Sequence, residues 1–154
     1  MAGKHVKVRV PIDIGGTRTE NLWAYPTDTP DLFKINSIPF FAYGLNDGDI
    51  VRCDKSGTVV EVVEASGFRT FRVRFQPGTD MEAMNTVAQR FHELGAGLNL
   101  GFPGFLSMDL GPDKDYDALV AYLDELVGQE RIVYETAEQR VEGSFSDPVQ
   151  QNAG

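Results

Sequence analysis

The stretch RTFRVRFQPGTDMEAMNTVAQRFHELG, residues 69–95, decides the fold because the spacing of its apolar residues changes within it. Residues 70–75 alternate polar and apolar side chains, which predicts a strand with one buried face. From Met81 the apolar residues recur every three or four positions, which predicts an amphipathic helix. Thr79 and Glu82 have the spacing of a capping box at the helix start, and Gly95 is expected to end it.

The chain after this stretch repeats the same two kinds of pattern. Two short apolar segments between residues 98 and 110 predict a pair of strands, and a helical pattern begins near Pro112 and ends at Gly128. Residues 131–135 predict a last strand. The order strand, helix, strand, strand, helix, strand is that of a ferredoxin-like half.

The chain before this stretch is rich in short strand patterns separated by glycine turns. It predicts a small antiparallel sheet or partial barrel, with Trp23 as a large anchor. We therefore expect an α+β protein with one fused domain over residues 1–142. Its β-rich half covers residues 1–68, its ferredoxin-like half covers residues 69–142, and residues 143–154 form a flexible polar tail.

Charge is distributed unevenly along the 154 residues, whose net charge is −9. Residues 1–79 hold ten Lys or Arg and nine Asp or Glu, which gives +1, whereas residues 80–142 hold four and thirteen, which gives −9. Asp147 contributes the remaining −1. This acidity disfavours nucleic acid, whose phosphates require basic side chains, and it could steer a basic protein partner to the C-terminal half.

The titratable residues suggest no cofactor and no metal site. Cys53 is the one cysteine, so an internal disulfide or a cysteine-built zinc site is excluded. His5 and His92 stand alone and cannot support a zinc hydrolase. The sequence has no signal-peptide pattern and no apolar run of the ~18 residues typical of a membrane span. A cytoplasmic protein without a membrane partner is therefore expected.

The segment Ile12–Thr17 resembles the phosphate loop of sugar kinases and actin-like ATPases, in which a strand delivers an Asp and a Gly-Gly turn. Those enzymes need two large lobes, which 154 residues cannot hold. A glycine turn is therefore the favoured interpretation.

Two groups of charged residues have a more specific placement. Arg72 and Arg74 share one face of the strand at residues 70–75, where they could hold an anion, although pairing with acids on neighbouring strands is favoured. Asp117, Asp124 and Glu125 fall on the outer face of the second helix. Small acidic inhibitors meet basic clefts through such faces, although most acidic helix faces are only solvated.

Four segments together resemble a bacterial family of about this length, known as domain of unknown function 4265. They are Glu20–Ala24, Ile35–Ala42, Gly48–Val51 and Ser66–Val73. The resemblance covers about residues 6–136. It implies a bacterial source and a shared core, and it brings no activity, cofactor or catalytic residue.

The leading functional hypothesis is a non-enzymatic binding module of the immunity or inhibitor type, whose acidic C-terminal half engages a basic protein. Asp117, Asp124 and Glu125 are the expected contact residues. The alternative is a small-molecule sensor or enzyme with a pocket. Its expected lining is Glu20, Trp23, Asn36 and Asp49. A third hypothesis is a subunit of a larger complex.

Overall fold

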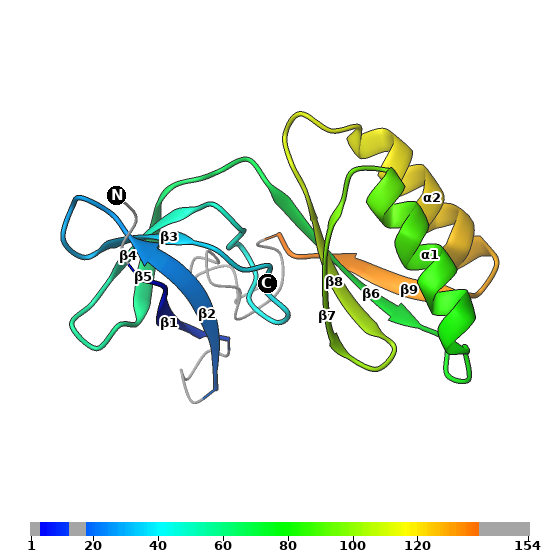
Figure 1. Ribbon diagram of the computed structural model, residues 1–154, viewed down its shortest axis with the longest axis horizontal. Coiled ribbons are helices and arrows are strands. Elements are labelled where there is room, and N and C mark those ends of the chain that lie inside the picture. Colours follow the sequence, from blue (N-terminus) through cyan, green and yellow to red (C-terminus); the bar gives the residue numbers. More distant parts are fainter. Residues whose placement is uncertain (1–3, 13–17, 139–154) are drawn as a thin grey trace, which may run out of the picture. The chain divides into compact units, whose positions relative to one another are not determined.

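The protein is an α+β structure with two helices and two antiparallel sheets, described by a computed structural model for residues 4–12 and 18–138. The chain divides into two compact units (Figure 1). One comprises residues 1–68 and 137–154, and the other residues 69–136. The single fused domain stays a prediction, and the predicted tail at residues 143–154 lies outside the described residues.

The N-terminal unit contains a five-stranded antiparallel sheet in which each strand pairs with the next one in sequence. Its strands are β1 (Val6–Pro11), β2 (Thr19–Pro26), β3 (Leu32–Ile35), β4 (Ile50–Cys53) and β5 (Val59–Glu64). The sheet bends so that its first strand meets the start of its last. The backbone N–H of Arg9 donates to the carbonyl oxygen of Gly57 at 2.9 Å, and Arg9 bridges Thr58.

Strict alternation along the strands fills the core of this unit. Val8 and Val10 on β1 and Leu22 and Ala24 on β2 are buried, whereas the residues between them are exposed. Trp23 is one of those between and 45% exposed, so it does not anchor the sheet as the sequence predicted. The inward positions of β1 and β2 instead hold the smaller side chains of Val, Leu and Ala.

The C-terminal unit contains a four-stranded antiparallel sheet with the strand order β7-β8-β6-β9. Its elements are β6 (Arg69–Phe75), α1 (Met81–Glu93), β7 (Gly97–Phe102), β8 (Phe105–Leu110), α2 (Tyr116–Gly128) and β9 (Ile132–Thr136). All six elements agree with the sequence prediction to within a few residues. β6 pairs with β8 on one side and with β9 on the other, so it lies inside the sheet.

Both helices cover one face of the four-stranded sheet (Figure 1). Phe91 of α1 and Leu123 of α2 belong to the same buried cluster as Phe71 and Val73 of β6 and Met108 of β8. Each helix thus contributes its apolar stripe to one core, and its polar side faces outward.

The caps differ slightly from the prediction. The N-cap of α1 is Asp80, whose side chain accepts a hydrogen bond from the backbone N–H of Ala83 at 2.8 Å. The predicted cap, Thr79, instead donates its hydroxyl to the carbonyl oxygen of Gln76. The C-terminal prediction is confirmed: the chain leaves α1 through Gly95, whose φ of +99° suits a residue without a β-carbon.

Candidate functional site

The outward sides of α1 and α2 carry five exposed carboxylates, which we name the acidic helix layer. Its members are Glu82, Glu93, Asp117, Asp124 and Glu125. The two helices contain a single arginine, Arg90, and no lysine. Arg90 Nη1 lies 3.4 Å from Glu93 Oε1 on the same helix, so this weak exposed pair removes little of the negative charge.

One member of the layer also has a structural contact. The hydroxyl of Tyr134 on β9 donates to Asp124 Oδ1 at 2.8 Å. Desolvation by burial and this hydrogen bond raise the pKa of Tyr134 to about 12, so the hydroxyl keeps its proton at neutral pH. Asp117 and Glu125 are the better probes of the layer, because a change at Asp124 also removes this contact.

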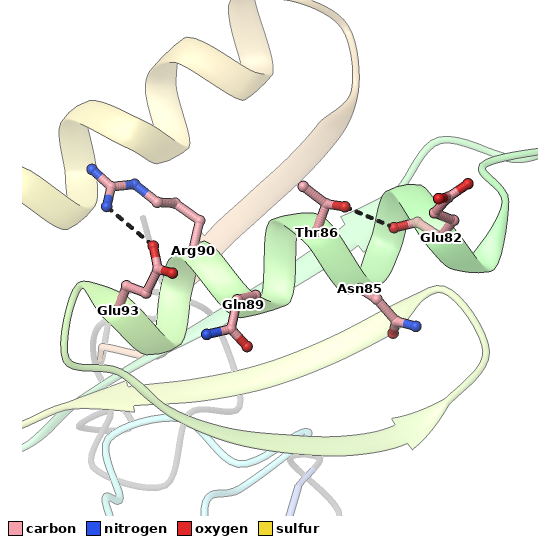
Figure 2. A pocket seen from close by; sticks show the side chains of 6 residues that line it. All are labelled: Glu82, Asn85, Thr86, Gln89, Arg90 and Glu93. Atoms are coloured by element: carbon pink, nitrogen blue, oxygen red, sulfur yellow. Dashed lines mark hydrogen bonds and ion pairs between the residues drawn. The ribbon is translucent and has the colours of Figure 1, made fainter.

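The outer side of α1 forms a shallow polar depression, whose lining Figure 2 shows. It is lined by Glu82, Asn85, Thr86, Gln89, Arg90 and Glu93. The two carboxylates lie at the ends of the row, about 16 Å apart along the helix axis at the ordinary rise per residue. The amides of Asn85 and Gln89 lie between them (Figure 2), so hydrogen-bonding groups separate the two negative charges.

A second surface, which we name the aromatic face, covers the outward side of β1 and β2. It consists of His5, Lys7, Trp23 and Tyr25. The imidazole of His5 stacks on Tyr25 with ring centroids 4.2 Å apart and on Trp23 at 5.3 Å. Lys7 Nζ lies 5.0 Å from the centroid of Trp23, which is a cation–π distance.

Asn36 lies at one edge of the aromatic face and contacts His5. Its Nδ2 lies 2.8 Å from Nε2 of His5, a hydrogen bond that sets the position of the imidazole. The backbone N–H of Asn36 donates to the carbonyl oxygen of Trp23 at 2.8 Å, and the backbone N–H of Trp23 donates to Ser37 Oγ at 2.9 Å. These contacts fix the strand that presents the indole.

Glu20 points to the opposite side of β2 and holds a loop. Its Oε2 accepts the backbone N–H of Phe40 at 2.7 Å, and its Oε1 accepts those of Phe41 and Ala42 at 3.0 and 2.9 Å. One carboxylate thus satisfies three successive donors, as an anion does in a backbone nest. The geometry assigns Glu20 to the folding of this loop.

The carboxylate of Asp49 also accepts hydrogen bonds from backbone N–H groups. It is 1% exposed, its Oδ2 accepts the N–H of Asn46 at 2.9 Å, and its Oδ1 accepts that of Ser66 at 2.8 Å. Desolvation raises the pKa of Asp49 above its ordinary value, and the two hydrogen bonds oppose that rise without cancelling it. Asp49 therefore ties the turn before β4 to the segment after β5.

The four residues predicted to line a pocket thus divide among three places. Trp23 and Asn36 meet through His5, whereas Glu20 and Asp49 bind separate loops. His5 was set aside in the sequence because it stands near the chain start and alone. The position of His5 two residues before Lys7 could have indicated that both side chains lie on the same outward side of β1.

The face of the C-terminal sheet away from the helices carries a buried polar group. Its members are Thr70, Arg72, Ser107 and Asp109. Arg72 is 2% exposed, although the sequence placed it on an open face. Its Nε lies 3.3 Å from Oε2 of Glu135 on β9, which confirms the predicted pairing with an acid on a neighbouring strand. Arg74 on the same face is exposed.

Cys53 is buried inside the N-terminal sheet and is not suited to nucleophilic chemistry. Burial, followed by the charges of Asp54 and Asp31, raises the pKa of its thiol to about 11. We expect a thiol-specific disulfide reagent at pH 8 to label native protein at least about a hundred-fold more slowly than urea-unfolded protein, because roughly a thousandth of the native thiol is ionised. Equal labelling rates would show that Cys53 is accessible and activated.

The described residues contain no group of three or more His, Cys, Asp or Glu placed to hold a metal ion. His92 is exposed on α1. No helix in the part of the chain that the structure describes has the length and apolarity to cross a membrane. The residues 13–17 of the predicted phosphate-loop segment lie outside the described ranges.

Comparison with known proteins gives a family and a similar fold. The solved structure titled "Novel crystal structure of a hypothetical protein from Neisseria gonorrhoeae" is similar with a TM-score of 0.68 and 22% identity. The match covers 88% of this chain and 95% of that one, and at this identity it shows the fold alone. No curated protein matches the chain. The family described as "Domain of unknown function (DUF4265)" matches residues 20–134, three-quarters of the sequence, and the chain therefore belongs to that family.

Proposed function

We propose that the protein is a non-enzymatic binding module whose acidic helix layer engages a basic protein partner, as immunity or inhibitor proteins do. The observation that carries the proposal is the placement of exposed carboxylates on two helices that cover the same sheet face. Five carboxylates from both helices therefore share one side of the unit, and Arg90 is the one Lys or Arg within α1 and α2.

The chemistry of this surface suits a partner with several Lys or Arg side chains. Negative potential over a face speeds the approach of a basic protein and rejects acidic ones. The amides of Asn85 and Gln89 add hydrogen bonds that can select among basic partners. Because the carboxylates are exposed, their attraction is screened by salt, and binding is expected to weaken as salt rises.

We also propose the finer fold assignments. Residues 69–136 form a ferredoxin-like half, which is supported by the order β7-β8-β6-β9, by antiparallel pairing throughout and by two helices on one face. The first sheet forms a partial barrel, which is supported by the hydrogen bond between Arg9 and Gly57.

The test compares two double variants with the same change in net charge. Asp117→Lys with Glu125→Lys alters the helix layer, and Asp28→Lys with Glu64→Lys alters exposed acids of the N-terminal unit. Native protein and both variants are immobilised, partners are captured from native lysate at low and moderate salt, and each captured protein is then purified and titrated.

We expect a basic protein to bind native protein and the N-terminal variant alike. Its affinity for the helix-layer variant should fall at least about ten-fold, because like charges replace opposite ones at the contact. The proposal is rejected if the purified partner binds both variants equally, or if moderate salt leaves its affinity unchanged.

A further inference from the structure

Positive charge is concentrated on the outward side of the first three strands of the N-terminal sheet. The net charge of the whole chain does not reveal this. The strands β1, β2 and β3 carry three cations, Lys7, Arg9 and Lys34, and all three are exposed. Their single acid, Glu20, projects to the inner side and binds the loop at residues 40–42. The outward side of these strands therefore carries three positive charges in a chain whose net charge is −9. Asp47 and Asp54, which lie outside the three strands, interact electrostatically with Lys34 and Arg9, and Lys7 has no such acid beside it in the described residues.

The rings of the aromatic face lie among these cations. Lys7 is the cross-strand partner of Trp23, and Lys34 is that of Tyr25, so each ring has a cation beside it. Trp23 leaves 45% of its surface exposed although its neighbours on the same strand are buried. Tyr25 is half-buried and its ring stacks on His5, so the indole of Trp23 is the exposed ring of this face. An exposed flat ring and nearby positive charges are the two features with which single-stranded nucleic acid is bound without sequence preference.

We propose that the aromatic face binds single-stranded nucleic acid. A base stacks on the exposed part of the Trp23 indole, and the phosphates contact Lys7, Arg9 and Lys34. Arg9 Nη2 donates to the carbonyl oxygen of Ser56 at 2.8 Å, which orients the guanidinium and leaves further donors for a phosphate. This surface and the acidic helix layer belong to different units, so this inference is independent of the proposed function.

The observations favour a single strand over the other anionic ligands. A duplex keeps its bases paired and stacked, so it can use the cations but not the rings. An acidic peptide likewise matches the cations, but the electron-rich face of the exposed indole does not attract its carboxylates. The acidity that disfavoured nucleic acid in the sequence comes from residues 80–142, none of which belongs to β1, β2 or β3.

The fluorescence of Trp23 can report binding, because Trp23 is the one tryptophan of the chain and lies within the proposed site. Its fluorescence is followed while the full chain is titrated with oligouridylate or oligothymidylate of about twelve nucleotides. Fluorescence anisotropy of labelled oligonucleotides gives the affinity independently of the tryptophan. The same titrations use uridine monophosphate, duplex DNA and polyglutamate as competing ligand classes.

We expect both single strands to quench Trp23 and to raise the anisotropy, with RNA and DNA distinguished by which binds more tightly. Trp23→Ala should weaken binding at least about ten-fold, and Trp23→Phe should retain most of it. Lys7→Gln should lower the slope of log affinity against log salt by about 0.7, the value for one phosphate contact with a single strand. Phe41→Ala should have no effect, since Phe41 is an equally exposed ring, at 46%, outside the site.

Several results would overturn the proposal. One is the absence of quenching and of any anisotropy change with both single strands at low salt. Another is equal binding of native protein and a folded Trp23→Ala variant, which would indicate charge attraction alone. Polyglutamate or the mononucleotide binding as tightly as the oligonucleotides would replace this ligand with an acidic peptide or a small molecule. Thermal unfolding of each variant verifies that it is folded.

Discussion

Glu20→Ala should lower the free energy of unfolding by about 3 to 5 kcal/mol, because one carboxylate accepts three backbone N–H groups. Hydrogen bonds to a charged acceptor contribute about 1.5 to 3 kcal/mol each, and the loop at residues 40–42 recovers part of that by binding water. The loop delivers Ala42 and Leu45 to the core of the N-terminal sheet, so its release also exposes apolar surface. Urea denaturation followed by Trp23 fluorescence measures the loss.

Glu20→Gln removes the negative charge and keeps nearly the same side-chain shape, so it separates the two contributions to stability. Its amide oxygen can still accept the N–H groups of Phe41 and Ala42, but its NH₂ group would face the N–H of Phe40 as a second donor. We expect an intermediate loss and faster amide hydrogen exchange at these three residues. Glu64→Ala is the control, since an exposed change of this kind stays within about 0.5 kcal/mol. If Glu20→Ala left the free energy of unfolding and the amide hydrogen exchange unchanged, the loop at residues 40–42 would not depend on Glu20 for its structure.

Asp49→Ala should lower the free energy of unfolding by about 2 kcal/mol, because Asp49 is buried and accepts two backbone N–H groups. The loss is smaller than for Glu20 because removing Asp49 also removes the cost of burying its charge. Asp49→Asn should cost about half as much, since the amide oxygen keeps one acceptor. Chemical denaturation at neutral pH compares the three proteins.

The pH dependence gives an independent measure of Asp49. Its pKa is raised in the folded state above the ordinary 3.8, so the folded protein holds this proton more tightly than the unfolded chain. The resulting stabilisation is complete below pH 3.8 and is lost as pH rises through the folded pKa. Asp49→Asn cannot titrate, so stability should fall less over this window in the variant than in the native protein. Parallel curves would show that Asp49 has an ordinary pKa in the folded protein.

Local patterns in the sequence were sufficient for nearly all secondary structure. The change of apolar spacing at residues 75–81 separates β6 from α1, because strand and helix bury every second and every third or fourth residue respectively. Gly95 ends α1 as expected, since a positive φ disfavours residues with a β-carbon. The cap was displaced by one residue because Thr79 and Asp80 are both able to cap a helix.

The three members of the acidic helix layer on α2 were also predictable, because the spacing of Leu119, Leu123 and Leu126 determines which side of α2 faces outward. The two members on α1, Glu82 and Glu93, were not predicted. The burial of Arg72 was not predictable from the sequence. Alternation assigns a residue to one face of a strand but does not tell whether that face is covered.

The aromatic face and the two loop-binding carboxylates depended on tertiary structure. Residues 22–24 are all apolar, so alternation had two possible registers, and only the paired sheet shows that Leu22 and Ala24 point inward and Trp23 outward. Glu20 meets a loop twenty residues away, and His5 meets Asn36 across thirty-one. By itself, the sequence determined the elements, their order and the acidity of the helices, because those follow from neighbouring residues. Only the tertiary structure decided which polar side chains bind the backbone and which remain available to a partner, because strand register brings distant residues together.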